Sequence, residues 1–509
     1  MFAKKQVFQI LLLIISIAIF LPTQMSAKDG FNIKLKVKGV QDTTCYLAYH
    51  YGKQIYVKDT FQINHKGTSI LKGDEKLTGG IYLIVLPEQR FFEFVIDTDE
   101  QQFSLETDTT DLIQNIKTSG SKANTLFIQH QKYVSKRQRE INTLAKIKDT
   151  TESEDSLILI DEKIETLSKE MADYRLEIIA QHPESFVATI LKAMQEPEAP
   201  ESPRDEDGKE IDPLFRYKYV KKHFWDNIDF SDERLLHTPI IHNKLQRYLE
   251  KLTTKTADSI NVACDVVIEK ARANEKAFRY VVATLTNKYE TSKIMGMDAI
   301  FVHLARNYYL TGDAYWVDST SIAKVKERVL RLQHNLIGKT AKNITLVDTD
   351  GKKHALYDLD NEYVVMLFWD YNCGHCKKQM PGYIDFYNNY KAKDVGFYSV
   401  CTRIEKEKIV KYQEEKELPF PTLYDPENTS YFRAYYDVSS TPMSFLLDKD
   451  KKILAKKLGS KQLGEVLDRF MKAKEREVEE AQKNTEKEEK VQDKKSEKGK
   501  KRKGKKGRK

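Results

Sequence analysis

Two cysteines three positions apart, Cys373 and Cys376, carry the clearest chemical signal in the sequence. They follow an apolar run rich in β-branched and aromatic residues, 363–369, and precede residues that are compatible with a helix. This order predicts that Cys373 lies where a strand passes into a helix. A thiol at a helix N-terminus meets unpaired N–H groups and the positive end of the helix dipole, which favour the thiolate. The pattern therefore predicts a dithiol that exchanges with disulfides.

Metal binding is the alternative interpretation of this spacing, because CxxC also occurs in zinc sites. A structural zinc site uses four Cys or His ligands, and no second CxxC or HxxxH pattern lies near Cys373. His237 and His242, further upstream, are five residues apart and do not share a helix face. We therefore predict no metal site.

The other three of the five cysteines have no partner at such a spacing. Cys45 and Cys264 fall in different predicted domains, so we expect buried free thiols rather than a disulfide between them. Cys401 ends an apolar run, 397–400, that reads as a strand. If this strand runs parallel to 363–369, Cys401 reaches the same sheet edge as the pair. It would be a third redox thiol there or, as we favour, a buried spectator.

The surroundings of the pair resemble the active site of the thioredoxin superfamily, in which a cis-proline loop faces the two cysteines. The layout of residues 337–472 is similar to that of the TlpA/ResA-like exported thiol-disulfide oxidoreductases. The residues that carry the resemblance are Phe368, Trp369, Cys373, Gly374, His375, Cys376, Pro381, Thr441 and Pro442. The resemblance implies a thioredoxin-like α/β fold and an oxidoreductase that needs no cofactor.

The motif itself suggests the following roles. Cys373 is expected to be the attacking nucleophile, and Cys376 the more buried resolving thiol. His375, which follows Gly374, can stabilise the thiolate and so make the disulfide more oxidising. A solvent-facing histidine without such a role is the alternative. By resemblance, Gly-His is also the pair that disulfide isomerases carry between their cysteines.

Four further residues are expected to shape the site. Trp369 should pack under it, and Pro381 should bend the helix that carries the cysteines. Thr441 and Pro442 should form a cis peptide, and the backbone beside it can pair with an extended substrate segment.

The sequence departs from the family at three positions. Leu367 stands where thioredoxin has a buried Asp, and Gln379 stands where ResA-like proteins have a Glu. Asn372 replaces the usual Trp before the first cysteine. The proton route at the second cysteine is therefore open, and Asp370, a water molecule or His375 would serve. These changes affect the redox potential and the choice of partner rather than the dithiol chemistry.

The N-terminus reads as an export signal, because two lysines precede an apolar run, 7–21, and a small residue, Ala27, follows it. This run of about 15 residues is shorter than the roughly 20 that span a bilayer. We predict a cleaved signal peptide over 1–27, with an uncleaved anchor as the alternative. The protein would lie in the periplasm or cell envelope. Its partners would be disulfide-containing envelope proteins and a membrane-bound thiol electron donor.

The net charge of +8 comes from the C-terminal tail. Residues 494–509 hold eleven Lys or Arg and one Glu, so subtracting this +10 leaves −2 for the rest. We predict a charged disordered tail over 475–509, although its mixed-charge part, 475–493, also suits an extension of the last helix. The basic block is either a solvated tail or a contact to an anionic surface. It has no interleaved aromatics, so we predict no nucleic-acid binding.

Three folded domains are expected ahead of this tail. Alternating apolar and polar residues, as in 31–37, predict an antiparallel β-sandwich over 28–115. Patterns of period 3.6 predict an all-α region over 116–336, and the thioredoxin-like domain spans 337–474. The predicted helices are 122–147, 153–182, 184–195, 212–226, 232–253, 256–272, 275–290, 294–309 and 319–336.

The main functional hypothesis is an exported thiol-disulfide oxidoreductase, with reduction favoured over isomerisation. The first alternative is an envelope protein whose β and helical domains bind a ligand or partner under redox control. A peroxide-reducing antioxidant is the minor alternative, because the residues around Cys373 lack the setting of a peroxidatic cysteine.

Overall fold

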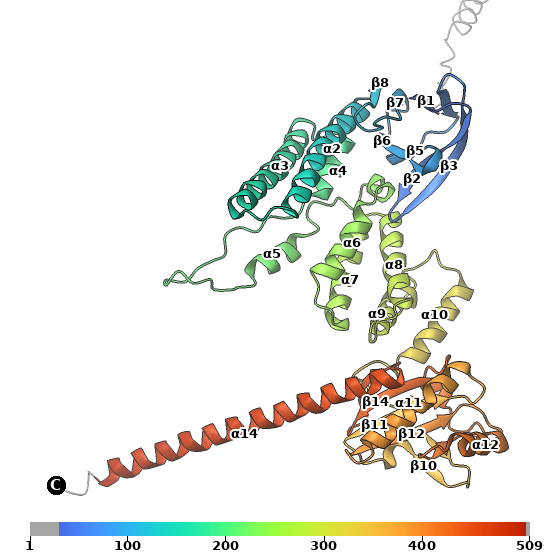
Figure 1. Ribbon diagram of the computed structural model, residues 1–509, viewed down its shortest axis with the longest axis vertical. Coiled ribbons are helices and arrows are strands. Elements are labelled where there is room, and N and C mark those ends of the chain that lie inside the picture. Colours follow the sequence, from blue (N-terminus) through green and yellow to red (C-terminus); the bar gives the residue numbers. More distant parts are fainter. Residues whose placement is uncertain (1–29, 505–509) are drawn as a thin grey trace, which may run out of the picture. The chain divides into compact units, whose positions relative to one another are not determined.

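Figure 1 shows the computed structural model, which describes residues 30–504, with side chains up to residue 483 except at 481. The predicted signal peptide, 1–27, lies outside the described residues, as does the end of the basic tail. The chain groups into two compact units. The first contains residues up to 255 and 263–278, and the second contains 256–262 and the chain from 279 onward.

The first unit begins with a β-sandwich, as predicted. Alternate residues of β1, such as Ile33 and Leu35, are buried in one core with Ile84 and Phe94 of the other sheet. The sheet orders are β4-β1-β7-β8 and β3-β2-β5-β6. The strands are β1 (Phe31–Lys38), β2 (Thr43–Tyr51), β3 (Gln54–Ile63), β4 (Thr68–Gly73), β5 (Gly80–Val85), β6 (Phe91–Ile96), β7 (Gln102–Asp108) and β8 (Lys117–Ser119). One pairing corrects the antiparallel prediction, because β1 and β7 run parallel. The strands between them in sequence provide the crossover that a parallel pair needs.

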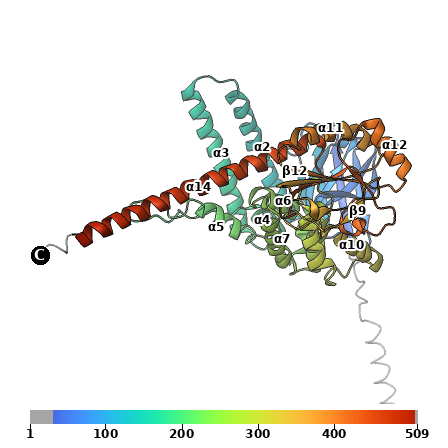
Figure 2. The same cartoon turned by 90° about the horizontal axis from the view of Figure 1, so that it is seen from below.

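Helices follow the sandwich close to the positions that the sequence predicts. They are α2 (Lys122–Lys148), α3 (Glu154–Gln181), α4 (Phe186–Met194), α5 (Phe215–His223), α6 (Ile240–Lys251) and α7 (Ala257–Ala271). Figure 2 shows α2 and α3 side by side as a hairpin. Helices α2, α3 and α4 begin sharply because Ser121, Ser153 and Ser185 each accept a backbone N–H from the first turn.

The single helix predicted over 232–253 is wrong, because two elements occupy this range. A 3-10 helix, η2 (Glu233–His237), is followed by α6. Pro239 separates them, since proline has no N–H and disfavours helical geometry in the residue before it, Thr238.

The second unit contains the predicted thioredoxin-like fold, which is confirmed. Its sheet has the order β13-β12-β11-β14-β15, with β12 parallel and β14 antiparallel to the central strand β11. The strands are β9 (Thr345–Val347), β10 (Lys353–Ala355), β11 (Tyr363–Trp369), β12 (Val395–Cys401), β13 (Thr422–Leu423), β14 (Met443–Asp448) and β15 (Ile453–Lys456). The helices are α8 (Glu275–Glu290), α9 (Asp298–Leu304), α10 (Ser319–Leu332), α11 (Gly374–Tyr390), α12 (Lys406–Lys416), α13 (Phe432–Tyr435) and α14 (Ser460–Gly504). The start of α8 belongs to the first unit.

Every residue of β11 is buried, because apolar side chains cover both faces of the sheet. Tyr383 of α11 and Leu463 of α14 lie in the core on one face. Leu356 and Phe432 lie in the core on the other face. This double cover explains why the sequence of the strand is a continuous apolar run.

Two parts of the chain that precede the sheet, α9 and residues 338–341, contact β15 or the turn before it. Lys456 Nζ lies 2.5 Å from Asp298 Oδ2 of α9, and the pair is mostly buried. Residues 338–341 also run along β15: the N–H of Gly338 donates to the carbonyl of Ile453, and that of Ala341 donates to Lys451. The chain that leads into the fold therefore hydrogen-bonds to the first residue of β15, Ile453, and to the turn before it.

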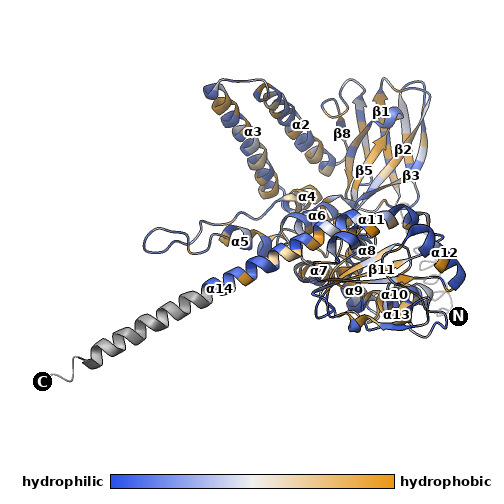
Figure 3. Cartoon of the chain, turned by 60° about the horizontal axis from the view of Figure 1, so that its bottom comes forward, coloured by the Kyte–Doolittle hydropathy of each residue, from blue (hydrophilic) through white to orange (hydrophobic). Residues whose placement is uncertain are grey.

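The tail predicted as disordered from residue 475 is different in the structure, because α14 continues to Gly504. Leu463 and Leu467 anchor its first turns in the core. Beyond them the helix-forming residues Glu and Lys alternate without proline, and Glu479 pairs with Lys483 one turn later. Figure 3 shows mainly hydrophilic residues along the described part of α14 beyond the core. None of the described helices, α14 included, is both long enough and apolar enough to span a bilayer.

Candidate dithiol active site

The cysteine pair lies at the turn from β11 into α11, as the sequence predicts. Trp369 ends the strand, and Cys373 is the N-cap residue of α11. The turn is closed by the N–H of Cys373, which donates to the carbonyl of Asp370 at 3.1 Å. The first helical residue, Gly374, is exposed, and a Cβ added there would meet no atom within 4 Å.

The Cys373 thiol is partly exposed and hydrogen-bonded. Its Sγ donates to the carbonyl oxygen of Thr441 at 3.3 Å. The peptide between Thr441 and Pro442 is cis, as predicted, and leads directly into β14. Burial raises the pKa of Cys373, but hydrogen bonds from the side chains of Thr441 and Cys376 and from the backbone N–H groups of His375 and Cys376 outweigh it. The pKa of this thiol therefore lies below its ordinary value, which favours the nucleophilic thiolate.

The Cys376 thiol has the opposite character. It is only 1% exposed, and burial raises its pKa to about 11. At neutral pH it is protonated and shielded from outside reagents. The two thiols of the pair therefore differ in both exposure and acidity, as an attacking and a resolving cysteine would.

Trp369 is buried in the core that also contains Cys376. Its indole Nε1 donates to the hydroxyl of Ser399 at 2.8 Å, and its ring lies 5.1 Å from that of Tyr412. The indole of Trp369 is therefore held in the core by Ser399 and Tyr412. His375 is exposed on the first turn of α11, and Pro381 is exposed further along this helix.

Cys401 reaches the same sheet edge as the pair, because β12 is parallel to β11 and Cys401 lies opposite Trp369. It is 1% exposed, and burial raises its pKa to about 12. This environment favours a buried spectator over a third redox thiol. Cys45 and Cys264 are buried and are not joined by a disulfide, which confirms that prediction.

An ion pair beside the site was not predicted from the sequence. Asp370 Oδ2 accepts a hydrogen bond from Arg403 Nε at 2.7 Å, and its Oδ1 accepts the N–H of Asn372 at the same distance. Arg403 lies two residues beyond the end of β12. The rule that parallel strands deliver their carboxyl ends to one edge would have pointed to it.

Gln379 is engaged at the start of α14. Its Oε1 accepts the N–H of Ser460 at 3.2 Å and a long hydrogen bond from the hydroxyl of Tyr383 at 3.5 Å. The amide at this departure from the family pattern therefore connects α11 to α14.

Three family models match consecutive parts of the chain. They are a domain of unknown function, DUF4369, over residues 31–127, a domain of unknown function, DUF5106, over 177–335, and the AhpC/TSA family over 337–456. The thiol-disulfide oxidoreductase ResA of a Bacillus cereus strain is 34% identical over 123 residues, which are 24% of this chain and 70% of that protein. The chain belongs to the ResA-like thiol-disulfide oxidoreductases.

A further ResA and two solved structures are also similar to this chain. ResA of Bacillus anthracis is 32% identical over 136 residues, which are 27% of this chain and 77% of that protein. The thioredoxin domain of a thiol-disulfide oxidoreductase from Bacteroides vulgatus is 28% identical, covers 26% of this chain and 96% of its own, and has a TM-score of 0.25. A thioredoxin-like protein from Bacteroides caccae is 21% identical, covers 53% of this chain and 96% of its own, and has a TM-score of 0.42.

The AhpC/TSA model matches residues 337–456, the part of the chain that contains Cys373 and Cys376. Within the described residues, no group of three or more His, Cys, Asp or Glu side chains is arranged to hold a metal ion. The zinc interpretation of the cysteine pair therefore has no further ligands in this part of the chain.

Proposed function

We propose that this oxidoreductase reduces disulfides of proteins in the cell envelope through Cys373 and Cys376. The observation that carries the proposal is the contrast within the pair. Cys373 is partly exposed with a lowered pKa, whereas Cys376 is buried with a pKa of about 11. A thiol pair with this contrast can attack an outside disulfide with one sulfur and keep the other in reserve.

The reaction proceeds in two exchange steps. The Cys373 thiolate attacks one sulfur of the client disulfide, the client S–S bond breaks, and a mixed disulfide forms. The leaving client sulfur takes up a proton from water. The Cys376 thiol then loses its proton and attacks Cys373 Sγ, which releases the second client sulfur. The client gains two electrons and two protons, and the cysteine pair is left as a disulfide.

The proton of Cys376 needs an acceptor in the second step. Both carboxylate oxygens of Asp370 already accept hydrogen bonds, one of them from Arg403. This arrangement favours a water molecule or the exposed His375 as the acceptor. A membrane-bound thiol donor would then reduce the pair and complete the cycle, in keeping with export by the signal peptide predicted over 1–27.

Insulin reduction in the presence of dithiothreitol tests the assignment. Cys373→Ser should abolish turnover, and Cys401→Ser is the matched control that should retain it. Cys376→Ser should accumulate mixed disulfides with clients, visible as adducts that disappear under reducing conditions. Normal turnover by Cys373→Ser would refute the proposed nucleophile.

The direction of electron flow is tested by the reduction potential of the pair. Reduction is proposed because the relatives with which the chain shares its family are thiol-disulfide oxidoreductases of the ResA type. A potential near or below that of thioredoxin, about −270 mV, is expected for a reductant. A potential near that of protein disulfide isomerase, about −180 mV, would instead support isomerisation.

A further inference from the structure

A cavity of about 400 Å³ opens within the first unit, far along the sequence from the cysteine pair. Residues of β5, β6, α2, α4 and α6 line it. Buried apolar side chains form much of its wall, among them Phe127, Ile190, Leu191 and Ile240. Met194 at its rim is 47% exposed, so the cavity is open to solvent. Its size is in the usual range of small-molecule sites, and its wall suits an apolar ligand body.

One cationic side chain in this cavity, Lys244, is buried. It is only 6% exposed, and its Nζ donates to the carbonyl oxygens of Gln195 at 2.8 Å and of Phe224 at 3.4 Å. An ammonium has three N–H donors, so one remains for another acceptor. Glu196, the acid whose charge acts on Lys244, forms its ion pair with Arg247. Its Nζ also lies 4.8 Å from the centroid of the Phe224 ring. The ammonium therefore has carbonyl acceptors and an aromatic face around it, but not the paired carboxylate that buried lysines usually have.

Lys456 in the second unit is a buried lysine with which Lys244 can be compared. It is buried to a similar degree, and its ammonium lies 2.5 Å from the carboxylate of Asp298. The chain thus supplies a carboxylate where it buries a lysine for structural reasons. For Lys244 the acid that acts on it, Glu196, is ion-paired with Arg247, and the lysine lines a cavity.

A second polar group in the cavity is also unsatisfied. His130 is 8% exposed, and its Nε2 is buried without a hydrogen-bond partner. Burial lowers the pKa of this histidine to about 4, so the ring is neutral at physiological pH. A neutral imidazole can donate one N–H to an anion without adding a charge of its own.

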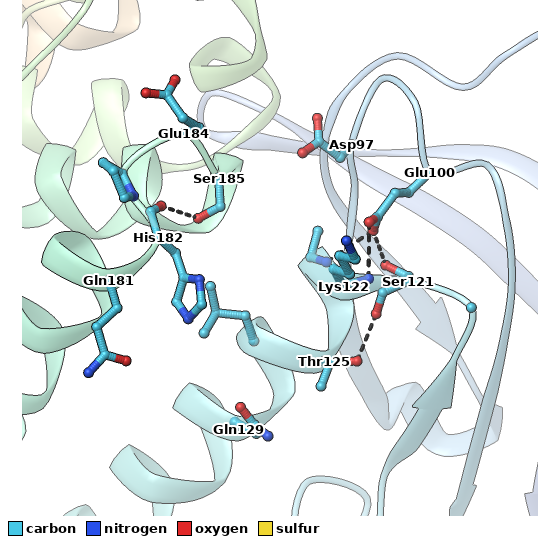
Figure 4. A pocket seen from close by; sticks show the side chains of 14 residues that line it. Asp97, Glu100, Ser121, Lys122, Thr125, Gln129, Gln181, His182, Glu184 and Ser185 are labelled. Carbon is cyan, nitrogen blue, oxygen red and sulfur yellow. Dashed lines mark hydrogen bonds between the residues drawn. The ribbon is translucent and has the colours of Figure 1, made fainter.

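A larger cavity of about 970 Å³, also in the first unit, is a weaker candidate for an anion site. Figure 4 shows that Glu100 points at the start of α2. Its carboxylate accepts the hydroxyl of Ser121 and the N–H groups of Lys122 and Ala123. The N–H groups that would attract an anionic ligand are therefore already occupied by the protein's own carboxylate.

We propose that the cavity of about 400 Å³ binds a small amphipathic carboxylate, such as a medium-chain fatty acid. The ligand's carboxylate accepts hydrogen bonds from Lys244 Nζ and His130 Nε2. Its apolar body packs against Phe127, Ile190 and Ile240. The site does not depend on the dithiol, and it gives the domains that precede the redox domain a binding role.

The charges around Lys244 predict how binding responds to pH. The surrounding groups are Glu196 after α4, Arg247 on α6, Glu93 on β6 and His130 on α2. Glu196 is paired with Arg247, and Glu93 is paired with His50. Burial lowers the pKa of Lys244 to about 8. A bound carboxylate stabilises the ammonium, so binding takes up protons near pH 8 and weakens about tenfold per pH unit well above it.

Titration calorimetry on the full chain tests the proposal, with octanoate as the probe and octanamide as its neutral analogue. Octanoate should bind at least tenfold more tightly than octanamide at pH 7. In two buffers of different ionisation enthalpy at pH 8, octanoate binding should show proton uptake. Equal affinities for the two compounds, or no uptake of protons, would overturn the proposed contact with Lys244.

Substitutions locate the site. Lys244→Met should weaken octanoate binding tenfold or more and leave octanamide unaffected, whereas Lys244→Arg should retain binding. Lys251→Met is the matched control, because Lys251 is an exposed lysine two turns further along α6. Met194→Trp should block the entrance for both probes without disturbing the core.

Unchanged octanoate binding in both Lys244→Met and Met194→Trp would place the ligand elsewhere and refute the site. Should Lys244→Met melt at a much lower temperature, Met194→Trp decides the question alone. The Cys373→Ser variant should bind octanoate as the unmodified chain does. Loss of redox activity and loss of carboxylate binding are thus separate results.

Discussion

The sulfur of Cys373 lies 3.3 Å from the carbonyl oxygen of Thr441, so the exposed thiol of the pair faces the residue that leads into β14. Strand β14 lies antiparallel to β11, with Met443 opposite Phe368. The start of α11 and the start of β14 therefore meet at one edge of the sheet. This edge fixes the nucleophile between two rigid elements rather than on a mobile loop.

Alkylation should distinguish the three cysteines at this edge. In the reduced, folded protein, iodoacetamide is expected to modify Cys373 and to spare Cys376 and Cys401, whose buried thiols have pKa values of about 11 and 12. The rate should rise with pH as the Cys373 thiolate forms, with a midpoint below that of an ordinary thiol, because the pKa of Cys373 is lowered. Peptide mass spectrometry measures the sites and the rates. Equal labelling of all three cysteines would contradict the asymmetry.

Stability should fall at high pH because of Cys401. Its folded pKa, about 12, lies above the value of about 8.5 for an unfolded thiol, so the folded state holds the proton longer. The stabilisation is complete below about pH 8.5 and is lost as pH rises towards 12. Cys401→Ala should reduce the decline of the unfolding free energy between pH 9 and 11 by up to about 1.4 kcal/mol per pH unit. Urea unfolding at several pH values measures this slope, and identical slopes would contradict the prediction.

Replacing only one partner of the buried ion pair between Lys456 and Asp298 should lower the free energy of unfolding strongly. Lys456→Met leaves the Asp298 charge buried without its partner and should destabilise the second unit by about 3–5 kcal/mol. Lys456→Met combined with Asp298→Leu should recover most of that loss. Urea unfolding of the full chain, followed by ¹⁹F NMR of 5-fluorotryptophan at Trp369, reports on this unit.

A matched control for this pair is Lys474→Met, because Lys474 pairs with Glu362 at the exposed surface. Its loss should have a much smaller effect, since solvent screens exposed ion pairs. Similar losses of stability in Lys456→Met and Lys474→Met would show that the buried pair stabilises the protein no more than the exposed one.

The sheet and the cysteine turn could be predicted because their signals are local. The apolar run before Cys373, the helix formers after it and the Thr441-Pro442 motif each need only a few neighbouring residues. The contacts that complete the site are not local. Arg403 and Asp370 are 33 residues apart, and Lys456 and Asp298 are 158 residues apart. A single sequence does not say which charged groups will meet across such separations.

Two departures from prediction had local causes that competed with the main pattern. Pro239 interrupted an amphipathic run that otherwise reads as one helix. In α14, helical propensity and pairs such as Glu479 with Lys483 outweighed the charge pattern that predicts disorder. The boundary at residue 336 stays a prediction, because the family models separate there but the compact unit begins at 279.

Removal of the polar part of α14 should leave the redox domain intact. A chain that ends at Arg476 should keep its thermal midpoint and its insulin reduction, because the described residues beyond this point are exposed. A chain that ends at Leu458 is the control. It loses Leu463 and Leu467, which are fully buried, and each such side chain stabilises a core by about 1.5–3 kcal/mol. Loss of activity in the longer chain would show that the exposed part of the helix takes part in catalysis.

The segment 338–341, which hydrogen-bonds along β15, determines where the redox domain can be cut free. Without it, the backbone groups of Ile453 at the start of β15 and of Lys451 before it would lose their partners, and unpaired groups at a sheet edge can recruit strands from other molecules. A fragment that starts at residue 342 should therefore self-associate, whereas one that starts at 337 keeps this segment and should stay monomeric.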